Sequence, residues 1–158
     1  MAEGASESAA FFATAQRELL VSVLNRLLPA AGPFPGAGDL GVVSYLDRVV
    51  RQSAMLKRLF TQGLLQITLA SQTQYAQPFT ALLEGQRDAV LQHIEVAAPE
   101  FFEALVTHTY SGYYSQPTIV RLLGLEGRPP QPHGHELEPL DLTLLDTIKQ
   151  RPPIYRQA

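Results

Sequence analysis

Apolar residues recur at helical spacing along most of the chain. The first such segment carries Leu20, Val23, Leu24 and Leu27 on one side, with polar residues such as Arg17 between them. The same rhythm returns in four later segments. It predicts helices over 11–28, over 39–71 as two helices or one helix kinked near 52–55, from Pro78 past Ile94, from Pro99 to about 111–112, and over 117–124.

Proline, glycine and capping residues separate these segments. Residues 29–38 are rich in Pro and Gly and cannot continue the first helix, so they predict a rigid turn. Asp39 then offers an N-cap for the next helix. Pro78 and Pro117 suit a first helical turn, where a missing N–H costs nothing.

The chain changes character after Gly124. Residues 127–135 are too rich in Pro and Gly for a helix or a central strand, and they predict an extended arm. A short helix is expected over 141–149, before an extended end at 152–155. No segment shows the alternation of a sheet, and no internal repeat is present. We therefore expect an all-α, single-domain bundle of about five to six helices. Its helical core spans 1–126, and an extended Pro-rich C-terminal arm, 127–158, either belongs to the same domain or wraps a partner.

Composition narrows the class of protein. The 158 residues are 46% hydrophobic and 17% charged, which is typical of a globular chain. A formal charge of -3 leaves no excess of Lys and Arg for a phosphate backbone, so nucleic acid is not expected as a partner. Cysteine is absent, which excludes thiolate metal sites and a catalytic thiol. No apolar run reaches the roughly 18 residues that a bilayer requires, and no export signal is apparent, so we expect no membrane insertion and a cytoplasmic protein as the sequence stands.

Residues that could carry chemistry do not form a recognisable active site. His133 and His135 lie close to Glu136 but lack further ligands of matched spacing, so a solvated loop explains them better than a metal site. His93 and His108 fall within amphipathic segments as surface or half-buried residues. The carboxylates Asp47, Glu84, Asp88 and Glu95 are expected on polar faces as solvated charges. We expect no catalytic, cofactor-binding or metal-binding residue in this chain.

Three tyrosines, Tyr110, Tyr113 and Tyr114, surround Gly112 in the most unusual local segment of the sequence. Such a cluster forms either a packed corner between helices, with hydroxyls bonded to backbone, or a contact surface, and the two roles are compatible. The arm points toward a contact as well, because a long structureless segment usually wraps something. Its apolar anchors include Leu144 and Tyr155, so these five residues are the candidate partner-binding set.

The order of short motifs resembles the gluconate 2-dehydrogenase subunit 3 family. The motifs are Phe11-Phe12 opening a helix, Leu27-Leu28-Pro29 closing it, Pro35-Gly36-Ala37 before Tyr45-Leu46-Asp47, Phe79 with Leu82, Phe101-Phe102, and the segment from Thr107 to Pro117. The resemblance spans nearly the whole chain. It implies a small, non-catalytic subunit that binds a large flavoprotein dehydrogenase of the glucose–methanol–choline class, sometimes beside a cytochrome c.

The resemblance also implies where the cofactor lies. FAD and the catalytic histidines would belong to the large partner, which acts on a sugar or polyol. Many members of the family carry a twin-arginine leader, and this sequence has no Arg pair near its N-terminus. The complex is therefore expected in the cytoplasm, or in the periplasm if a leader was removed.

Two other function classes remain. The chain could be a free-standing helical binding module in which the tyrosine cluster lines a pocket for a small ligand. It could also be an independent hydrolase or metalloenzyme, which the motif scan does not favour. Copurification distinguishes the binding module from the accessory subunit, because only the accessory subunit should copurify with a large yellow flavoprotein.

Overall fold

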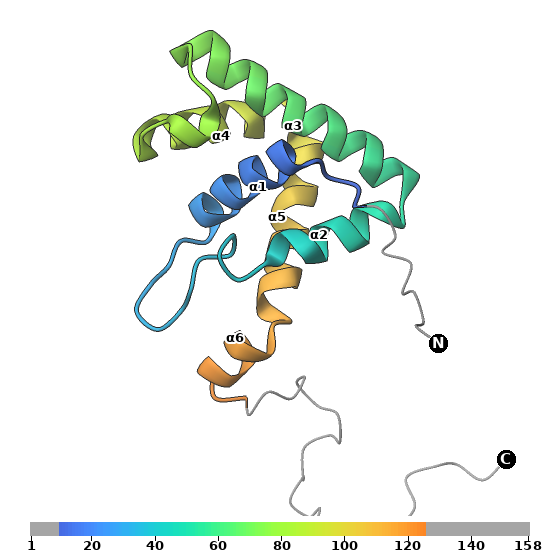
Figure 1. The fold of residues 1–158 in the computed structure, drawn as a ribbon, viewed down its shortest axis with the longest axis vertical. Coiled ribbons are helices and arrows are strands. Elements are labelled where there is room, and N and C mark those ends of the chain that lie inside the picture. The colour runs from blue at the N-terminus through green and yellow to red at the C-terminus, as the bar shows by residue number, and fades with distance from the viewer. Residues whose placement is uncertain (1–9, 126–158) are drawn as a thin grey trace, which may run out of the picture.

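The computed structural model describes residues 10–125, and within that range the chain folds into helices joined by short turns (Figure 1). Its β-structure in that range is a single isolated bridge between Ala31 and Phe34. The elements are α1 (Thr14–Leu27), α2 (Val42–Arg51), α3 (Ala54–Tyr75), the 3₁₀ helix η1 (Phe79–Ala81), α4 (Glu84–Ala97), α5 (Pro99–Tyr114) and α6 (Pro117–Leu122). The expected all-α fold is confirmed for this part of the chain, whereas the arm lies outside it.

The helices pack around α3 and α5. Helix α3 contacts α2, α4 and α5, and α5 contacts α2, α3, α4 and α6. Figure 1 shows α3 and α4 side by side at one end of the bundle and α6 at the other, with α5 running between them. The long axis of the fold therefore follows α5.

A row of aromatic rings forms the middle of the core. The rings of Phe12 and Phe60 lie 6.1 Å apart, and those of Phe60 and Phe101 meet edge to face at 5.4 Å. All three side chains are buried, and leucines such as Leu20 and Leu105 pack into the same cluster. The row connects the segment before α1 to α3 and α5. Aromatic pairs in this geometry stabilise a core beyond the area that they bury.

Helix α1 begins three residues later than the sequence pattern predicts. The N–H groups of Phe11 and Phe12 donate to Oδ1 of Asp47 on α2, at 2.9 and 3.1 Å, and these bonds fix the two residues against α2 before the helix begins. The N–H of Ala13 donates instead to Oε1 of Gln16 at 2.9 Å, and the helix starts at Thr14.

The Pro- and Gly-rich turn after α1 is held by a side chain of α1. Oδ1 of Asn25 accepts the N–H of Gly38 at 2.8 Å, while its Nδ2 donates to Asp39 at 3.0 Å. Because a Cβ at Gly38 would overlap the carbonyl oxygen of Val21, only glycine allows this approach. The prediction that Asp39 caps the next helix is wrong, since its carboxylate is bound to Asn25. Helix α2 starts at Val42, after Gly41 with a φ of 80°.

Residues 39–71 form two helices, as one of the two alternatives predicted. The backbone turns at Gln52 and Ser53, and the Ser53 hydroxyl accepts the N–H of Leu56 at 3.2 Å, which caps α3. Helix α3 then runs to Tyr75, beyond the expected end near Ser71.

The expected helix start at Pro78 is also displaced. Pro78 precedes η1, and α4 begins at Glu84. Arg87 explains the short turn, because its Nε and Nη2 donate to the carbonyl oxygens of Phe79 and Thr80 at 3.2 and 2.7 Å. These two bonds span eight and seven positions, which is outside the three- and four-residue spacing from which the helix start was predicted.

The last two helices start at prolines, as predicted. Pro99 and Pro117 occupy first turns, but α5 continues through Gly112 to Tyr114 instead of ending at 111–112. Glycine at position 112 allows α2 to pack closely against α5, because a Cβ there would lie 2.7 Å from Cδ1 of Tyr45. Helix α6 closes at Gly124, which has a φ of 77°; its N–H bonds to Arg121, and the next N–H bonds to Val120.

Candidate functional site

Two of the three clustered tyrosines lie on the surface. Tyr110 and Tyr114 are one turn apart on α5, with 43% and 46% of each residue exposed. Their rings are stacked, with centroids 5.9 Å apart and an interplanar angle of 26°. An exposed stacked pair offers a large, rigid, partly apolar area with two hydroxyls, which is a composition enriched at protein interfaces. Their role in binding a partner stays a prediction.

Tyr113 lies in a packed corner between elements, which is the other role that the sequence allowed for the tyrosine cluster. It is 5% exposed, and its hydroxyl donates to the carbonyl oxygen of Pro35 at 2.8 Å. Its ring meets that of Tyr114 edge to face at 5.3 Å. Burial raises the pKa of the Tyr113 hydroxyl above its usual value, and the neighbouring Tyr114 adds to this increase. Tyr113 therefore fixes the end of α5 to the first turn, beneath the exposed pair.

Further exposed apolar residues lie at the same end of the fold. Leu122, Leu123 and Leu125, in and after α6, are 39%, 46% and 46% exposed, and α6 packs on α5. These leucines are not among the candidate residues predicted from the sequence. The sequence did contain a signal for their exposure. Three leucines lie within four positions, and helical spacing can place only some of them on the core side.

The remaining members of the candidate set, Leu144 and Tyr155, lie outside the described residues, as do His133, His135 and the whole arm. Their part in binding therefore stays a prediction.

The histidines within the described range occupy separate helices. His93 is exposed on α4, and His108 is half-buried on α5, as expected. Among residues 10–125, no three His, Asp or Glu side chains come together in a group that could hold a metal ion. No helix in the same range is long and apolar enough to cross a bilayer.

Asp47 corrects one expectation of the sequence analysis, because it is not a solvated charge. It is 6% exposed and accepts the two N–H groups before α1. Arg17 and Arg51 approach its carboxylate at 3.6 and 3.3 Å. Two arginines and two backbone donors satisfy this carboxylate, which accordingly has a structural role: it attaches the start of α1 to α2.

Asp88 is likewise paired instead of free. Its carboxylate accepts two bonds from Arg26 of α1, at 2.5 and 2.6 Å, and Glu84 approaches the same guanidinium at 3.4 Å. The hydrogen bond with Arg26 is the main reason that the pKa of Asp88 falls below its usual value. The pair links α1 to α4.

Surface hollows lie along α3, away from the tyrosines. One, of about 290 Å³, lies between α1 and α3 and includes Leu19 and Leu65. A second, of about 390 Å³, lies between α3 and α4 and includes Leu69 and His93. A third, of about 280 Å³, lies where the α4–α5 corner meets α3, beside Glu100. None of these three hollows has a tyrosine in its lining.

The comparisons with known proteins agree with the helical boundaries. The model of the family described as Gluconate 2-dehydrogenase subunit 3 matches residues 14–124, from the first residue of α1 to the glycine that closes α6. No curated protein and no solved structure matches the chain. The match covers well over half of the sequence and all of the helices described above. The chain therefore belongs to the gluconate 2-dehydrogenase subunit 3 family.

Proposed function

We propose that this chain is a non-catalytic small subunit that binds and stabilises a large FAD-dependent dehydrogenase of the glucose–methanol–choline class acting on a sugar or polyol. A cytochrome c subunit is a further partner in this proposal.

Family membership is the observation that carries the proposal. The family is that of a dehydrogenase subunit, and a subunit has a partner subunit. The match covers the helical fold and not a detached motif, so the shared feature is the bundle itself. This favours a role for the whole bundle in binding a partner over a role for any one side chain.

The chemistry of the polar residues supports a structural role. Asp47 accepts hydrogen bonds from two backbone N–H groups and forms ion pairs with two arginines, and Asp88 is paired with Arg26. The Tyr113 hydroxyl donates its hydrogen bond to the carbonyl oxygen of Pro35. Each of these groups joins one element to another, and general acid or base work requires a group that can reach a substrate.

The proposal assigns FAD to the partner subunit. The pyrophosphate of a dinucleotide is ordinarily held by a Gly-rich turn between a strand and the N-terminus of a helix. Residues 10–125 form helices joined by turns, and the glycines near Gly38 face the side chain of Asn25.

The α5–α6 end is the surface that the proposal assigns to the partner first. Tyr110 and Tyr114 lie there with the exposed leucines that follow Pro117. The alternative, a binding module with a pocket lined by tyrosines, gains no specific support, because the hollows described along α3 contain none.

The test is coexpression of the full chain, carrying an affinity tag, with a candidate FAD-dependent dehydrogenase subunit from the same genome. We expect a yellow complex to copurify, whereas the chain alone carries no flavin absorbance and oxidises no sugar. Tyr110→Ala with Tyr114→Ala should weaken the complex, and Leu83→Ala, at a 74% exposed residue on another turn, is the matched control. Stoichiometric flavin on the isolated chain, or a wild-type chain that never copurifies, would refute the proposal.

A further inference from the structure

The outward face of α3 has an unusual composition for a surface helix. Between Arg58 and Glu84 the chain holds no Asp, Glu, Lys, Arg or His. Helix α3 fills most of this stretch, and its exposed positions from Thr61 to Thr73 are Thr, Gln and Leu. We call these positions the neutral face of α3. A helix that faces only water normally carries charged residues on the side opposite the core.

Two exposed leucines form an apolar ridge along the middle of the neutral face. Leu65 and Leu69 are one turn apart, so they lie in one line along the helix, and they are 57% and 55% exposed. The core side of α3 is formed by Phe60, Leu64 and Ile67, about half a turn away. The two leucines therefore point outward and are not residues at the edge of the core.

A hollow lies on each side of this ridge. Thr61, Leu65 and Thr68 border the hollow of about 290 Å³ toward α1. Gln66, Leu69 and Thr73 border the hollow of about 390 Å³ toward α4. The face is thus an apolar ridge between two depressions, and its rims carry hydroxyl and amide groups that can form hydrogen bonds.

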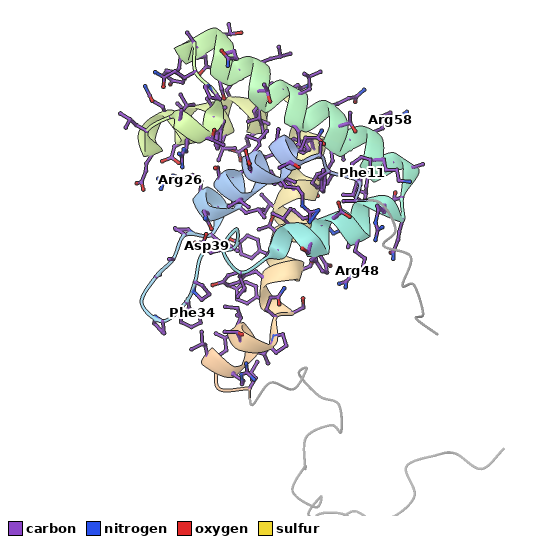
Figure 2. All side chains as sticks on the ribbon, in the orientation of Figure 1. Phe11, Arg26, Phe34, Asp39, Arg48 and Arg58 are labelled. Atoms are coloured by element: carbon purple, nitrogen blue, oxygen red, sulfur yellow. The ribbon has the colours of Figure 1, made fainter. Side chains whose placement is uncertain are left out.

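Charges appear only where the neutral face ends. Lys57 and Arg58 precede it on α3, and Figure 2 shows Arg58 projecting from the outer side of the helix. Toward the α4–α5 corner, Glu100 lines the third hollow. Depletion of charge at the centre, with charged groups at the rim, is the composition of a protein interface.

We infer that the neutral face of α3 is a docking surface for the dehydrogenase subunit, which meets it with an uncharged, concave apolar surface and an acidic group opposite Arg58. The inference rests on the proposed function and adds a second contact, at the end of the bundle opposite α6. Charge complementarity defines the orientation: the acidic group of the partner lies at the start of α3, because the rim is positive there.

The strip of α3 is too small to be a whole interface, so its occupant must also cover the surface on both sides of the helix. Thirteen helical residues span about 20 Å, and a helix is about 10 Å wide, so the strip alone offers on the order of 200 Å². A stable interface needs about 800 Å² from each partner. A second copy would present a ridge of its own and could fill only one hollow, whereas a concave partner can cover the ridge and both hollows.

The experiment uses the full chain coexpressed with its dehydrogenase subunit, and compares Leu65→Lys with Leu69→Lys in one variant against Leu83→Lys as the control. All three positions are more than half exposed, so none of the substitutions removes a buried side chain. Lysine keeps the helical propensity of leucine at positions 65 and 69, and Leu83 lies outside the helix as the N-cap of α4. We expect the double variant to bind about 100-fold more weakly, mainly through faster dissociation, and the control to bind as the wild type does. Leu65→Gln with Leu69→Gln, which adds no charge, should weaken binding in the same direction.

Arg58→Glu tests the orientation. It should slow association, and the effect should diminish as salt is added. If the wild-type complex forms and the double lysine variant binds equally well, the neutral face is not the interface, although the proposed function stands. If the wild type does not copurify, both fail. If the chain alone forms a dimer that the lysine variant abolishes, a second copy occupies the face and the inference is overturned.

Discussion

Gly63 of α3 lies against the ring of Phe101 of α5, so closely that a Cβ at position 63 would overlap the ring carbons. The two helices cross at this point, and Phe101 ends the row of rings that runs through Phe60.

Gly63→Ala should therefore destabilise the fold, although alanine is the better helix former. Overpacking of a core typically costs about 1 to 3 kcal/mol. Gly85→Ala, in α4 with open space around it, should instead stabilise by about 0.5 to 1 kcal/mol. Chemical denaturation followed by circular dichroism measures both, and the loss at Gly63 should shrink in a Phe101→Leu background. Equal effects of the two alanine substitutions would contradict the close crossing.

Removal of the Asp47 carboxylate should loosen the start of α1. Asp47→Ala removes the acceptor of two backbone donors and the carboxylate that Arg17 and Arg51 approach, which we expect to cost about 2 to 4 kcal/mol. Asp47→Asn keeps an acceptor oxygen and should cost less. Glu95→Ala, at an exposed site, is the control and should stay within about 0.5 kcal/mol. A loss at Asp47 no larger than that of the control would show that the attachment adds nothing to stability.

The Arg26–Asp88 pair predicts a pH-dependent contribution of fixed sign. Because the pKa of Asp88 is lowered in the fold, the ionised form is favoured there. The stabilisation is present above the unfolded value of about 3.9 and is lost as the pH falls through the lowered pKa. Asp88→Asn should lower the melting temperature at neutral pH, and the difference should vanish in acid. Glu103→Gln, exposed on α5, should show no such trend.

Tyr113→Phe should remove one hydrogen bond and leave the packing intact. The expected cost is about 1 kcal/mol, whereas Tyr110→Phe should be neutral because that residue is 43% exposed. The raised pKa of Tyr113 means that its contribution is complete below the unfolded value of about 10 and is lost as the pH rises through the folded pKa. An ultraviolet titration should resolve one tyrosine that ionises late, and that component should be missing in Tyr113→Phe.

Deletion of residues 128–158 tests the candidate residues that lie outside the described range. We expect the helical core to stay folded and association with the dehydrogenase subunit to weaken, with Leu144 and Tyr155 among the residues responsible. Leucines and aromatic side chains gain about 1.5 to 3 kcal/mol on full burial, which a bare linker would not offer. Circular dichroism and partner pull-down on the same deletion decide the matter. Loss of folding would show that the arm packs on the helical core and stabilises it. Unchanged folding with unchanged binding would refute the prediction.

Local signals were sufficient for much of the fold. Helix starts at Pro99 and Pro117 and the end at Gly124 follow from the backbone chemistry of proline and glycine, and they appear where expected. Ser53 was an available cap signal for α3, at the break that the hydrophobic rhythm had left open. The family resemblance, carried by short motifs in order, is confirmed by the match over residues 14–124.

Distant partners account for the errors. Asp39 looked like a cap because serine, threonine and aspartate usually serve that way, but Asn25, 14 positions earlier, binds it. Asp47 looked solvated because its buried donors are 35 and 36 positions away. At the candidate surface, helical spacing was an available signal, because Tyr113 continues the row of buried residues of α5 at four-residue intervals while Tyr110 and Tyr114 lie beside that row. The hydrogen bond from Tyr113 to Pro35 left no such signal, because the two residues are 78 positions apart.

The bond from Tyr113 to Pro35 joins residues 78 positions apart. During synthesis, which proceeds from the N-terminus, α1 and the turn after it emerge early, so both partners of the Asn25–Gly38 bond are present from that point on. The second attachment cannot form until the last turn of α5 has left the ribosome. The first turn of the protein therefore reaches its final anchored state only after nearly all of the helical bundle has been made, and completion of α5 is the event that closes the fold.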